Sequence, residues 1–303
     1  MQLKDTALYL LLVFVPCAVS CQESTATSAP AESVPSAPNF SHDQIRELIR
    51  QVAEKDMEND KKQRDYTYIE REQEHTLDRK GQVKSTETKT YEIMELYGGQ
   101  VSRLIAKNDK PLSQKDAAKE EEKVQKVIDK RKNESEDDRR KRLEKEEKSR
   151  EEDRRFVREV ADAYNFRPLG TEQLSGHSTW VFDADPRPEY RPRHKDGKYL
   201  PKFRFRAWID QKEMQWAKLD IQCIDTVSWG LFIARIHKGS RIVIEQTRVN
   251  DEVWLPKHIA LKLDARIALL KNFNVEEDLT YHDYKKFRTD TKIVPMGEVQ
   301  EPH

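Results

Sequence analysis

Between Thr179 and Phe287, apolar and polar side chains alternate along a series of short segments. In Phe203–Asp210, for example, Phe, Ala and Ile occupy one set of alternate positions and Arg, Trp and Asp occupy the other. The pairs Gly239-Ser240 and Asn250-Asp251 are turn signals between further segments of this kind. This pattern predicts antiparallel strands with one buried and one solvated face. Because the buried face needs a cover, we expect an α+β fold with helices over one side of the sheet.

A helix that begins after Ser41 is one candidate cover. Ser41 and Gln44 have the spacing of a capping box. Apolar residues then recur at helical spacing, namely Ile45, Leu48, Ile49, Val52 and Met57. This apolar stripe can pack on a sheet or on a membrane surface. We favour the sheet, because the polar side of the helix is not predominantly basic.

Period-two alternation is also found in the first half of the chain. Tyr66 and Tyr68 alternate with polar residues, and Gly98-Gly99 marks a turn before a return strand at Val101–Ala106. The strand before this turn has large apolar residues on both sides: Tyr91, Ile93 and Tyr97 on one, and Met94 and Leu96 on the other. We therefore expect these strands to belong to the same antiparallel sheet.

A charged segment interrupts the strands. Of the 27 residues from Asp129 to Arg155, 12 are basic and 11 acidic, and Leu143 is the only large apolar one. The pattern predicts a long helical insertion, at about residues 113–164, whose ends dock and whose middle is solvated. The apolar a and d positions of a coiled coil are missing. The insertion is either a solvated helix or an arm that docks a partner. Six acid–base pairs have the i,i+4 spacing that supports an exposed helix: Glu136–Arg140, Asp137–Lys141, Asp138–Arg142, Glu144–Lys148, Glu146–Arg150 and Glu151–Arg155.

The charge balance narrows the class of partner. The chain has 55 basic and 55 acidic side chains, so it lacks the excess of Lys and Arg that favours nucleic-acid binding. Charged residues make up 36% of the chain, which argues against a polytopic membrane protein.

The N-terminus has the features of an export signal. Lys4 precedes an apolar run from Ala7 to Val19, which is shorter than the roughly 20 residues of a membrane-spanning helix. The sequence Ala18-Val19-Ser20-Cys21 resembles a bacterial lipobox, in which Cys21 is acylated and becomes the first mature residue; it also suits ordinary signal peptidase. The Ser-, Thr-, Ala- and Pro-rich segment Gln22–Asn39 is then a flexible tether.

These segments predict the domain boundaries of the chain and the cellular location of the protein. We expect a signal peptide at 1–20, the lipidated cysteine and linker at 21–40, a folded domain at 41–290 and a tail at 291–303. The protein is expected on the periplasmic side of a bacterial envelope, anchored in the outer membrane by Cys21 or otherwise soluble in the periplasm. Cys223 would then be the one cysteine left unmodified, and its alternating neighbours predict a buried position in a strand.

Several C-terminal motifs carry a family resemblance. They are Ala207–Asp210, Lys218–Asp220, Gly239-Ser240, Asp251–Pro256 and the proline-rich loop at Asp185–Tyr190. Their order resembles the lipoprotein-carrier superfamily, which includes LolA, LolB and outer-membrane lipoprotein-sorting proteins. The resemblance covers about residues 41–290 and is closest to a branch with a charged helical insertion. It implies a strongly curved antiparallel sheet, an incomplete β-barrel, with helices capping its concave face and a cavity there for acyl chains.

One set of alternate residues would point to that concave face. They are Phe203, Phe205, Ile209, Leu219, Ile221, Ile242, Ile244, Ile259, Leu261 and Leu263. If the helices fill the concave side, these residues form an ordinary core. If the helices leave a gap, the same residues line an apolar ligand pocket.

Enzyme signatures are missing from the sequence. There is no phosphate-binding loop, no Gly-x-Ser-x-Gly elbow and no His-Glu-x-x-His helix, and the eight histidines are scattered, so we expect no metal site and no cofactor.

Three hypotheses for the function remain. The first is a lipid-anchored protein that binds a lipid or acylated ligand, for lipid or lipoprotein sorting; the second is an interaction module that docks an envelope protein through its charged helix; the third is an unrecognised hydrolase.

Overall fold

The computed structural model describes residues 40–97, 99–229, 234–267 and 271–286. Its helices are α2 (His42–Gln63), α3 (Gln114–Lys132), α4 (Glu136–Ala163) and the short 3₁₀ helix η1 (Gly197–Lys202). The strands of the first half are β1 (Tyr66–Leu77), β2 (Val83–Glu95), β3 (Gln100–Lys107), β4 (Lys110–Pro111), β5 (Tyr164–Leu174) and β6 (His177–Pro186). Those of the second half are β7 (Phe203–Asp210), β8 (Trp216–Cys223), β9 (Val227–Trp229), β10 (Ala234–Ile236), β11 (Arg241–Val249), β12 (Val253–Ile267) and β13 (Lys271–Lys286).

All thirteen strands form one sheet, and every pairing in it is antiparallel. The order is β4-β3-β2-β1-β13-β12-β11-β8-β7-β6-β5, with β9 and β10 as a side branch on β12. Strands β1 to β4 therefore join the rest of the sheet where β1 pairs with β13. The predicted α+β class and antiparallel sheet are confirmed.

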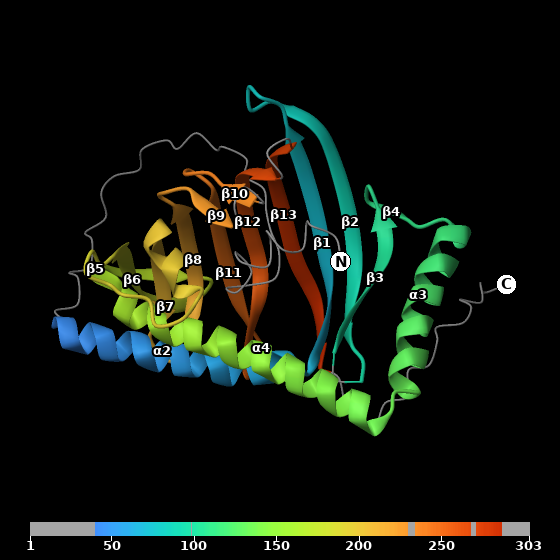
Figure 1. The fold of residues 1–303 in the computed structure, drawn as a ribbon, viewed down its shortest axis with the longest axis horizontal. Coiled ribbons are helices and arrows are strands. Elements are labelled where there is room, and N and C mark those ends of the chain that lie inside the picture. Colours follow the sequence, from blue (N-terminus) through green and yellow to red (C-terminus); the bar gives the residue numbers. More distant parts are fainter. Residues whose placement is uncertain (1–39, 98, 230–233, 268–270, 287–303) are drawn as a thin grey trace.

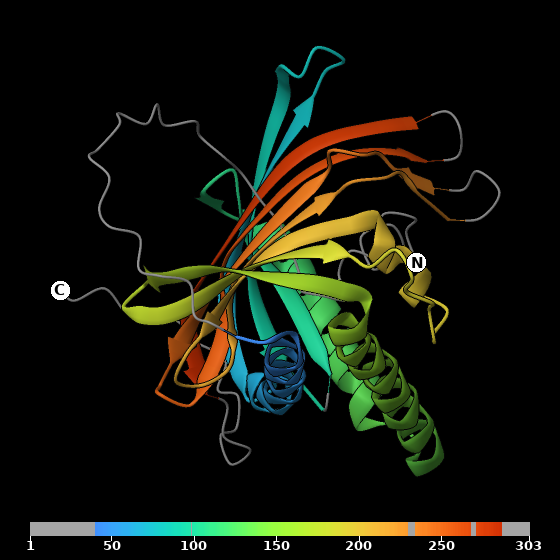
Figure 2. The ribbon, with the colours of Figure 1, turned by 90° about the vertical axis from the view of Figure 1, so that its left-hand side faces the viewer.

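The sheet is open, and the expected strong curvature is not found. The strands twist into a fan (Figure 2), and the edge strands β4 and β5 do not pair with each other within the described residues. Closure of a barrel requires the edge strands to pair. Helix α4 leads from the β3–β4 end of the sheet to β5 at the other end (Figure 1). Its 28 residues correspond to about 42 Å.

Helices α2 and α4 lie side by side against one face of the sheet (Figure 1), which we call the inner face. The predicted capping box at the start of α2 is confirmed: Gln44 N donates to Ser41 Oγ (3.2 Å) and Ser41 N donates to Gln44 Oε1 (2.8 Å). The predicted apolar stripe of α2 is buried in the main core, where Ile49 and Val52 have no exposed surface. The stripe thus covers the sheet, as predicted.

The charged insertion is two helices, which corrects the prediction of one. Helix α3 ends at Lys132, and Ser135 caps the start of α4 by accepting a hydrogen bond from Asp138 N (3.1 Å). A Ser at this position favours a new helix start over continuation.

The middle of α4 is solvated as expected, with Leu143 38% exposed. Of the six predicted acid–base pairs, Glu146–Arg150 and Glu151–Arg155 are formed.

Helix α3 packs on the outer face of the sheet. Met94, Leu96 and Val101 contact its Val124, Val127 and Ile128 in a separate apolar cluster. Ile93, next to Met94 on β2, points the other way into the main core. This explains why the sequence places apolar residues on both sides of β2. At this end of the sheet, each face has its own cover.

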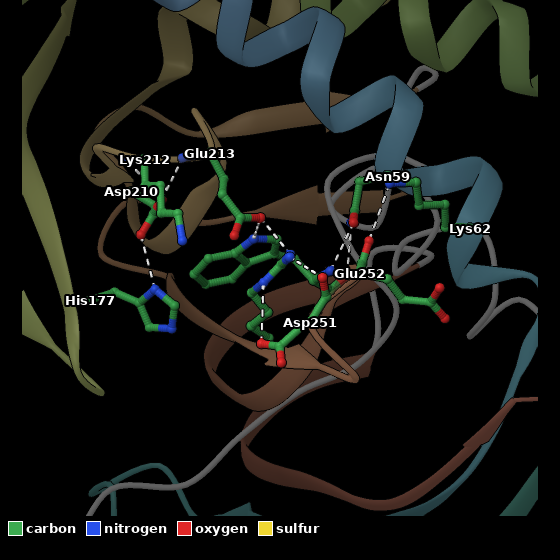
Figure 3. A network of polar contacts seen from close by, with 10 residues as sticks. Asn59, Lys62, His177, Asp210, Lys212, Glu213, Asp251 and Glu252 are labelled. Carbon is green, nitrogen blue, oxygen red and sulfur yellow. Dashed lines mark hydrogen bonds and ion pairs between the residues drawn. The ribbon is translucent and has the colours of Figure 1, made fainter.

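A buried asparagine fastens α2 to β12 (Figure 3). Asn59 Nδ2 donates to the carbonyl oxygen of Trp254 (2.7 Å), and Trp254 N donates to Asn59 Oδ1 (2.8 Å). Asn59 is only 4% exposed, so the side chain replaces water for two backbone groups of β12. Glu213 extends the network by accepting from Trp254 Nε1 (3.0 Å) and Arg248 Nη1 (2.5 Å).

The same network holds the turn between β7 and β8. The carboxylate of Asp210 accepts from Lys212 N (3.0 Å) and Glu213 N (2.7 Å), and its other oxygen lies 3.0 Å from His177 Nδ1. Asp210 and Trp254 belong to two of the motifs that carry the family resemblance. Their structural role is therefore to hold two β-turns and the end of α2 together.

Replacing Asn59 with Ala is expected to lower the free energy of unfolding by about 1–3 kcal/mol. The change leaves the buried N–H group of Trp254 without its partner. The carbonyl oxygen of Trp254 keeps a hydrogen bond from Gln63 Nε2 (2.9 Å). Urea unfolding measures the effect. Gln51→Ala on the exposed side of α2 is the control and is expected to change stability by less than about 0.5 kcal/mol. Equal effects of the two substitutions would contradict the fastening role of Asn59.

Candidate functional site

A pocket with an almost wholly apolar lining lies between α4, η1 and the inner face of the sheet. We call it the apolar pocket. Its lining consists of Phe156, Val157, Val160, Tyr164, Asp196, Tyr199, Leu200, Phe203, Phe205, Trp216, Leu219, Ile221 and Ile242. Asp196 is the one charged residue among them. The pocket thus offers an apolar surface to a ligand and few polar groups to orient one.

The structure divides the ten predicted cavity residues into two groups. Phe203, Phe205, Leu219, Ile221 and Ile242 line the apolar pocket. Ile209, Ile244, Ile259, Leu261 and Leu263 do not line it and pack in the main core. All of them lie in the apolar clusters on the inner face, so the alternation assigned their side of the sheet correctly.

Part of the lining could be recognised in the sequence and part could not. Phe156, Val157 and Val160 come from the end of the charged insertion, which was expected to dock. Trp216 was missed, because the pairing of β7 with β8 contains a β-bulge. Trp208 pairs with Lys218 and Ile209 with Trp216, so Ala217 is the extra residue and Trp216 lies on the inner face. A bulge interrupts the alternation of sides along a strand, and the sequence pattern gives no reliable sign of it.

The pocket is small in this conformation. Its volume is about 50 Å³, whereas sites that enclose drug-sized ligands have roughly 300–1,000 Å³. Tyr164 helps to close it, since its hydroxyl donates to the carbonyl oxygen of Leu200 (2.7 Å). Burial raises the pKa of Tyr164 well above its usual value, so the phenol stays neutral. A long apolar chain enters only if one wall of the pocket moves.

A second, charged groove lies between α2, α4 and the loop before η1. It has a volume of about 340 Å³ and includes Arg50, Glu54, Arg158, Asp162 and Arg193. These residues pair with one another: Arg50 with Asp162 (3.2 Å), Arg193 with Asp162 (3.0 Å) and Arg158 with Glu54 (2.7 Å). The ion pairs link the two helices that cover the sheet.

The inner face becomes acidic towards β1 and β2. Carboxylate oxygens of Glu72, Glu74 and Glu277 lie within 4.8 Å of one another on β1 and β13. Lys89 pairs with Glu72 (3.7 Å), and all three glutamates are half-buried. Carboxylates alone are weak evidence for a cation site, and no His or Cys joins this cluster in the described part of the chain.

Cys223 is buried in β8, as predicted. It is 1% exposed, and its Sγ donates to the carbonyl oxygen of Asp225 (3.1 Å). Burial raises the pKa of the thiol to about 11. The thiolate that reacts with oxidants and electrophiles is therefore scarce at neutral pH.

None of the helices in the described residues is both long enough and apolar enough to cross a membrane. The predicted signal peptide, Cys21 and the tether all lie outside the described residues. Their assignment stays a prediction from the sequence.

Comparisons with known proteins show a distant similarity of fold. No protein-family model matches the chain, and no curated protein matches its sequence. A putative outer membrane lipoprotein-sorting protein domain from Vibrio parahaemolyticus is 12% identical, with a TM-score of 0.33 over 80% of this chain and 95% of that one. A DUF1329 family protein from Desulfovibrio piger is 10% identical, with a TM-score of 0.30 over 82% and 95%.

A LolA superfamily protein from Nitrosomonas europaea is 11% identical, with a TM-score of 0.29 over 74% of this chain and 86% of that one. Solved structures of the superfamily named from the sequence are thus among those to which this chain is distantly similar. At this distance it concerns the fold alone.

The acidic part of the inner face gives the protein a pH dependence. Glu70 is 8% exposed, and burial, with the neighbouring Glu72, raises the pKa of its carboxyl from 4.5 to about 7. Between these pH values the folded state keeps a proton that the unfolded state releases. Stability therefore falls as the pH rises from about 4.5 to 7, by about 3 kcal/mol for this group.

Replacing Glu70 with Gln is expected to remove this part of the pH dependence, because the amide mimics the protonated acid. Compared with the natural protein, the variant should gain stability at pH 8 and little at pH 5. Urea unfolding at the two pH values measures the difference. An identical gain at both would show that Glu70 does not titrate in this range.

Proposed function

We propose that this protein binds an acyl chain or another apolar ligand in the apolar pocket and acts as a carrier in lipid or lipoprotein sorting. The observation that carries the proposal is the apolar pocket itself, which lies between a helical cover and the inner face of the sheet. Its role is one of binding, and no catalytic step is proposed.

Burial of the chain is the driving force. Transfer of methylene groups from water to an apolar lining contributes about 0.8 kcal/mol for each CH₂. Association costs roughly 4–15 kcal/mol before any net binding is seen. A ligand with one long chain or several shorter ones thus suits the pocket, whereas a small apolar molecule gains too little.

The N-terminal segments supply the proposed location. If Cys21 is acylated, Gln22–Asn39 is a tether that holds the folded domain near a membrane surface. The position of Gln22 after the cysteine favours the outer membrane, because retention in the inner membrane usually depends on an Asp there. The carrier would then receive and release ligands on the periplasmic side of the envelope.

Docking of an envelope partner is the second candidate function. It is favoured by the exposed charges along α4, where Arg139, Arg140 and Lys141 face solvent. Arg140 pairs only within its own helix, with Asp137 (2.8 Å) and Glu144 (3.8 Å). A partner could engage this surface without disturbing the core. Such a function predicts no ligand in the apolar pocket.

Filling the pocket is expected to weaken ligand binding. Val160 lines the pocket from α4, and Val160→Phe places a larger side chain there. Val52→Phe is the matched control: Val52 is also a buried helical valine in the main core, but it does not line the pocket. Overpacking costs each variant about 1–3 kcal/mol of stability.

The measurement is equilibrium titration with a fluorescent fatty acid. We expect Val160→Phe to raise the dissociation constant at least tenfold and Val52→Phe to leave it within about threefold. Absence of binding to the natural protein would refute the carrier function. Equal weakening in both variants would place the ligand outside the apolar pocket.

Trp216 gives a direct report of the site, because it lines the pocket. A fatty acid brominated along its chain should quench tryptophan emission in the natural protein and lose most of that effect in Trp216→Phe. Trp180→Phe, on the β6 strand and outside the lining, is the control and should keep the quenching. If quenching survives the loss of Trp216, the chain does not lie in the pocket.

A further inference from the structure

One wall of the apolar pocket is a segment without strand pairing. Residues 187–202 connect β6 to β7 and contain η1. They contribute Asp196, Tyr199 and Leu200 to the lining. The other walls are strands fixed by ladder hydrogen bonds and helix α4, which packs on the core beside α2.

Both ends of this segment are tied to the rest of the fold. Arg187 N donates to the carbonyl oxygen of Ala163 (2.9 Å), at the end of α4. At the other end, the carbonyl oxygen of Lys202 accepts from Ile224 N (2.8 Å). The part between these two ties can therefore swing while its ends stay in place.

Glu159 of α4 holds the middle of the segment. Its Oε1 atom accepts two hydrogen bonds, from the hydroxyl of Tyr190 (2.6 Å) and from Arg193 N (2.5 Å). Asp162, one turn further along α4, adds an ion pair with Arg193 (3.0 Å). The closed position thus depends on polar contacts to α4, together with the hydrogen bond from Tyr164 to Leu200 (2.7 Å) and the burial of Leu200 in the main core.

The second oxygen of Glu159 is unsatisfied. Glu159 is 4% exposed, and its Oε2 atom is buried without a hydrogen-bond partner in the structure. A buried acceptor without a donor contributes nothing to stability. Only one of the two carboxylate oxygens of Glu159 thus takes part in holding the segment.

Gly197 makes the close approach possible. A Cβ atom at this position would lie 2.7 Å from the hydroxyl oxygen of Tyr190 and 2.8 Å from Glu159 Oε2. Both distances are shorter than a van der Waals contact. Any side chain at residue 197 must push these two groups away, so the contact between segment and helix needs glycine here.

We propose that residues 187–202 form a lid over the apolar pocket and that Glu159 is the latch that holds the lid closed. The inference rests on the proposed function, because the lid gates entry of the apolar ligand. In the closed form the pocket has about 50 Å³, which does not hold an acyl chain. Opening the lid moves Tyr199 and Leu200 away and enlarges the pocket without breaking a strand pair or displacing α4.

The experiment combines hydrogen exchange with the rate of ligand uptake. Tyr190→Phe removes one latch hydrogen bond, and Gly197→Ala displaces both latch groups. Glu159→Gln keeps an acceptor oxygen for both donors and should behave nearly as the natural protein. Glu54→Ala is the matched control. It breaks the ion pair between Glu54 of α2 and Arg158 of α4, next to Glu159, without touching the lid.

We expect Tyr190→Phe and Gly197→Ala to speed exchange of the Arg193 amide at least tenfold and to leave the Leu219 amide in β8 unchanged. Stopped-flow mixing with the fluorescent fatty acid should show uptake at least fivefold faster in both variants. Glu54→Ala should change neither rate by more than about twofold, as a surface ion pair contributes little.

The two readouts separate the lid from the carrier function. Unchanged exchange at Arg193 in both variants overturns the latch. Faster exchange with unchanged uptake shows that the segment moves but does not gate the pocket, which overturns the lid. In both of these outcomes the proposed function stands, provided that the natural protein binds the fluorescent fatty acid. Failure of the natural protein and every variant to bind the probe overturns both.

Discussion

Burial of one face of an open antiparallel sheet is the constraint on which the rest of this structure depends. Strands β1, β2, β5 to β8 and β11 to β13 place apolar side chains in the main core, which α2 and α4 cover. Polar contacts hold the two covering helices to the sheet and to each other. Asn59 fastens α2 to β12, and ion pairs such as Arg50–Asp162 fasten α2 to α4.

The proposed site follows from an imperfect fit between this cover and the sheet. Where α4 passes over β7, β8 and β11, the two surfaces leave the apolar pocket, and residues 187–202 close the remaining side. Helix α4 thus combines a solvated, charged first half with a second half that is part of the core.

Much of the fold was predictable because the signals are local. The capping box at Ser41, the buried position of Cys223 and the inner-face side of Leu219 and Ile242 all follow from residues close in sequence. The candidate site was only half predictable. Trp216 depends on a β-bulge, and Tyr199 and Leu200 depend on where a loop comes to rest against α4.

The sequence by itself determined which residues are apolar, in what period they recur and where α2 begins. It therefore determined the antiparallel sheet, its buried face and the helix that covers it. Only the tertiary structure decided that the sheet stays open and that Glu159 meets Tyr190 and Gly197. These features depend on distances between segments far apart in the chain, which no local pattern encodes.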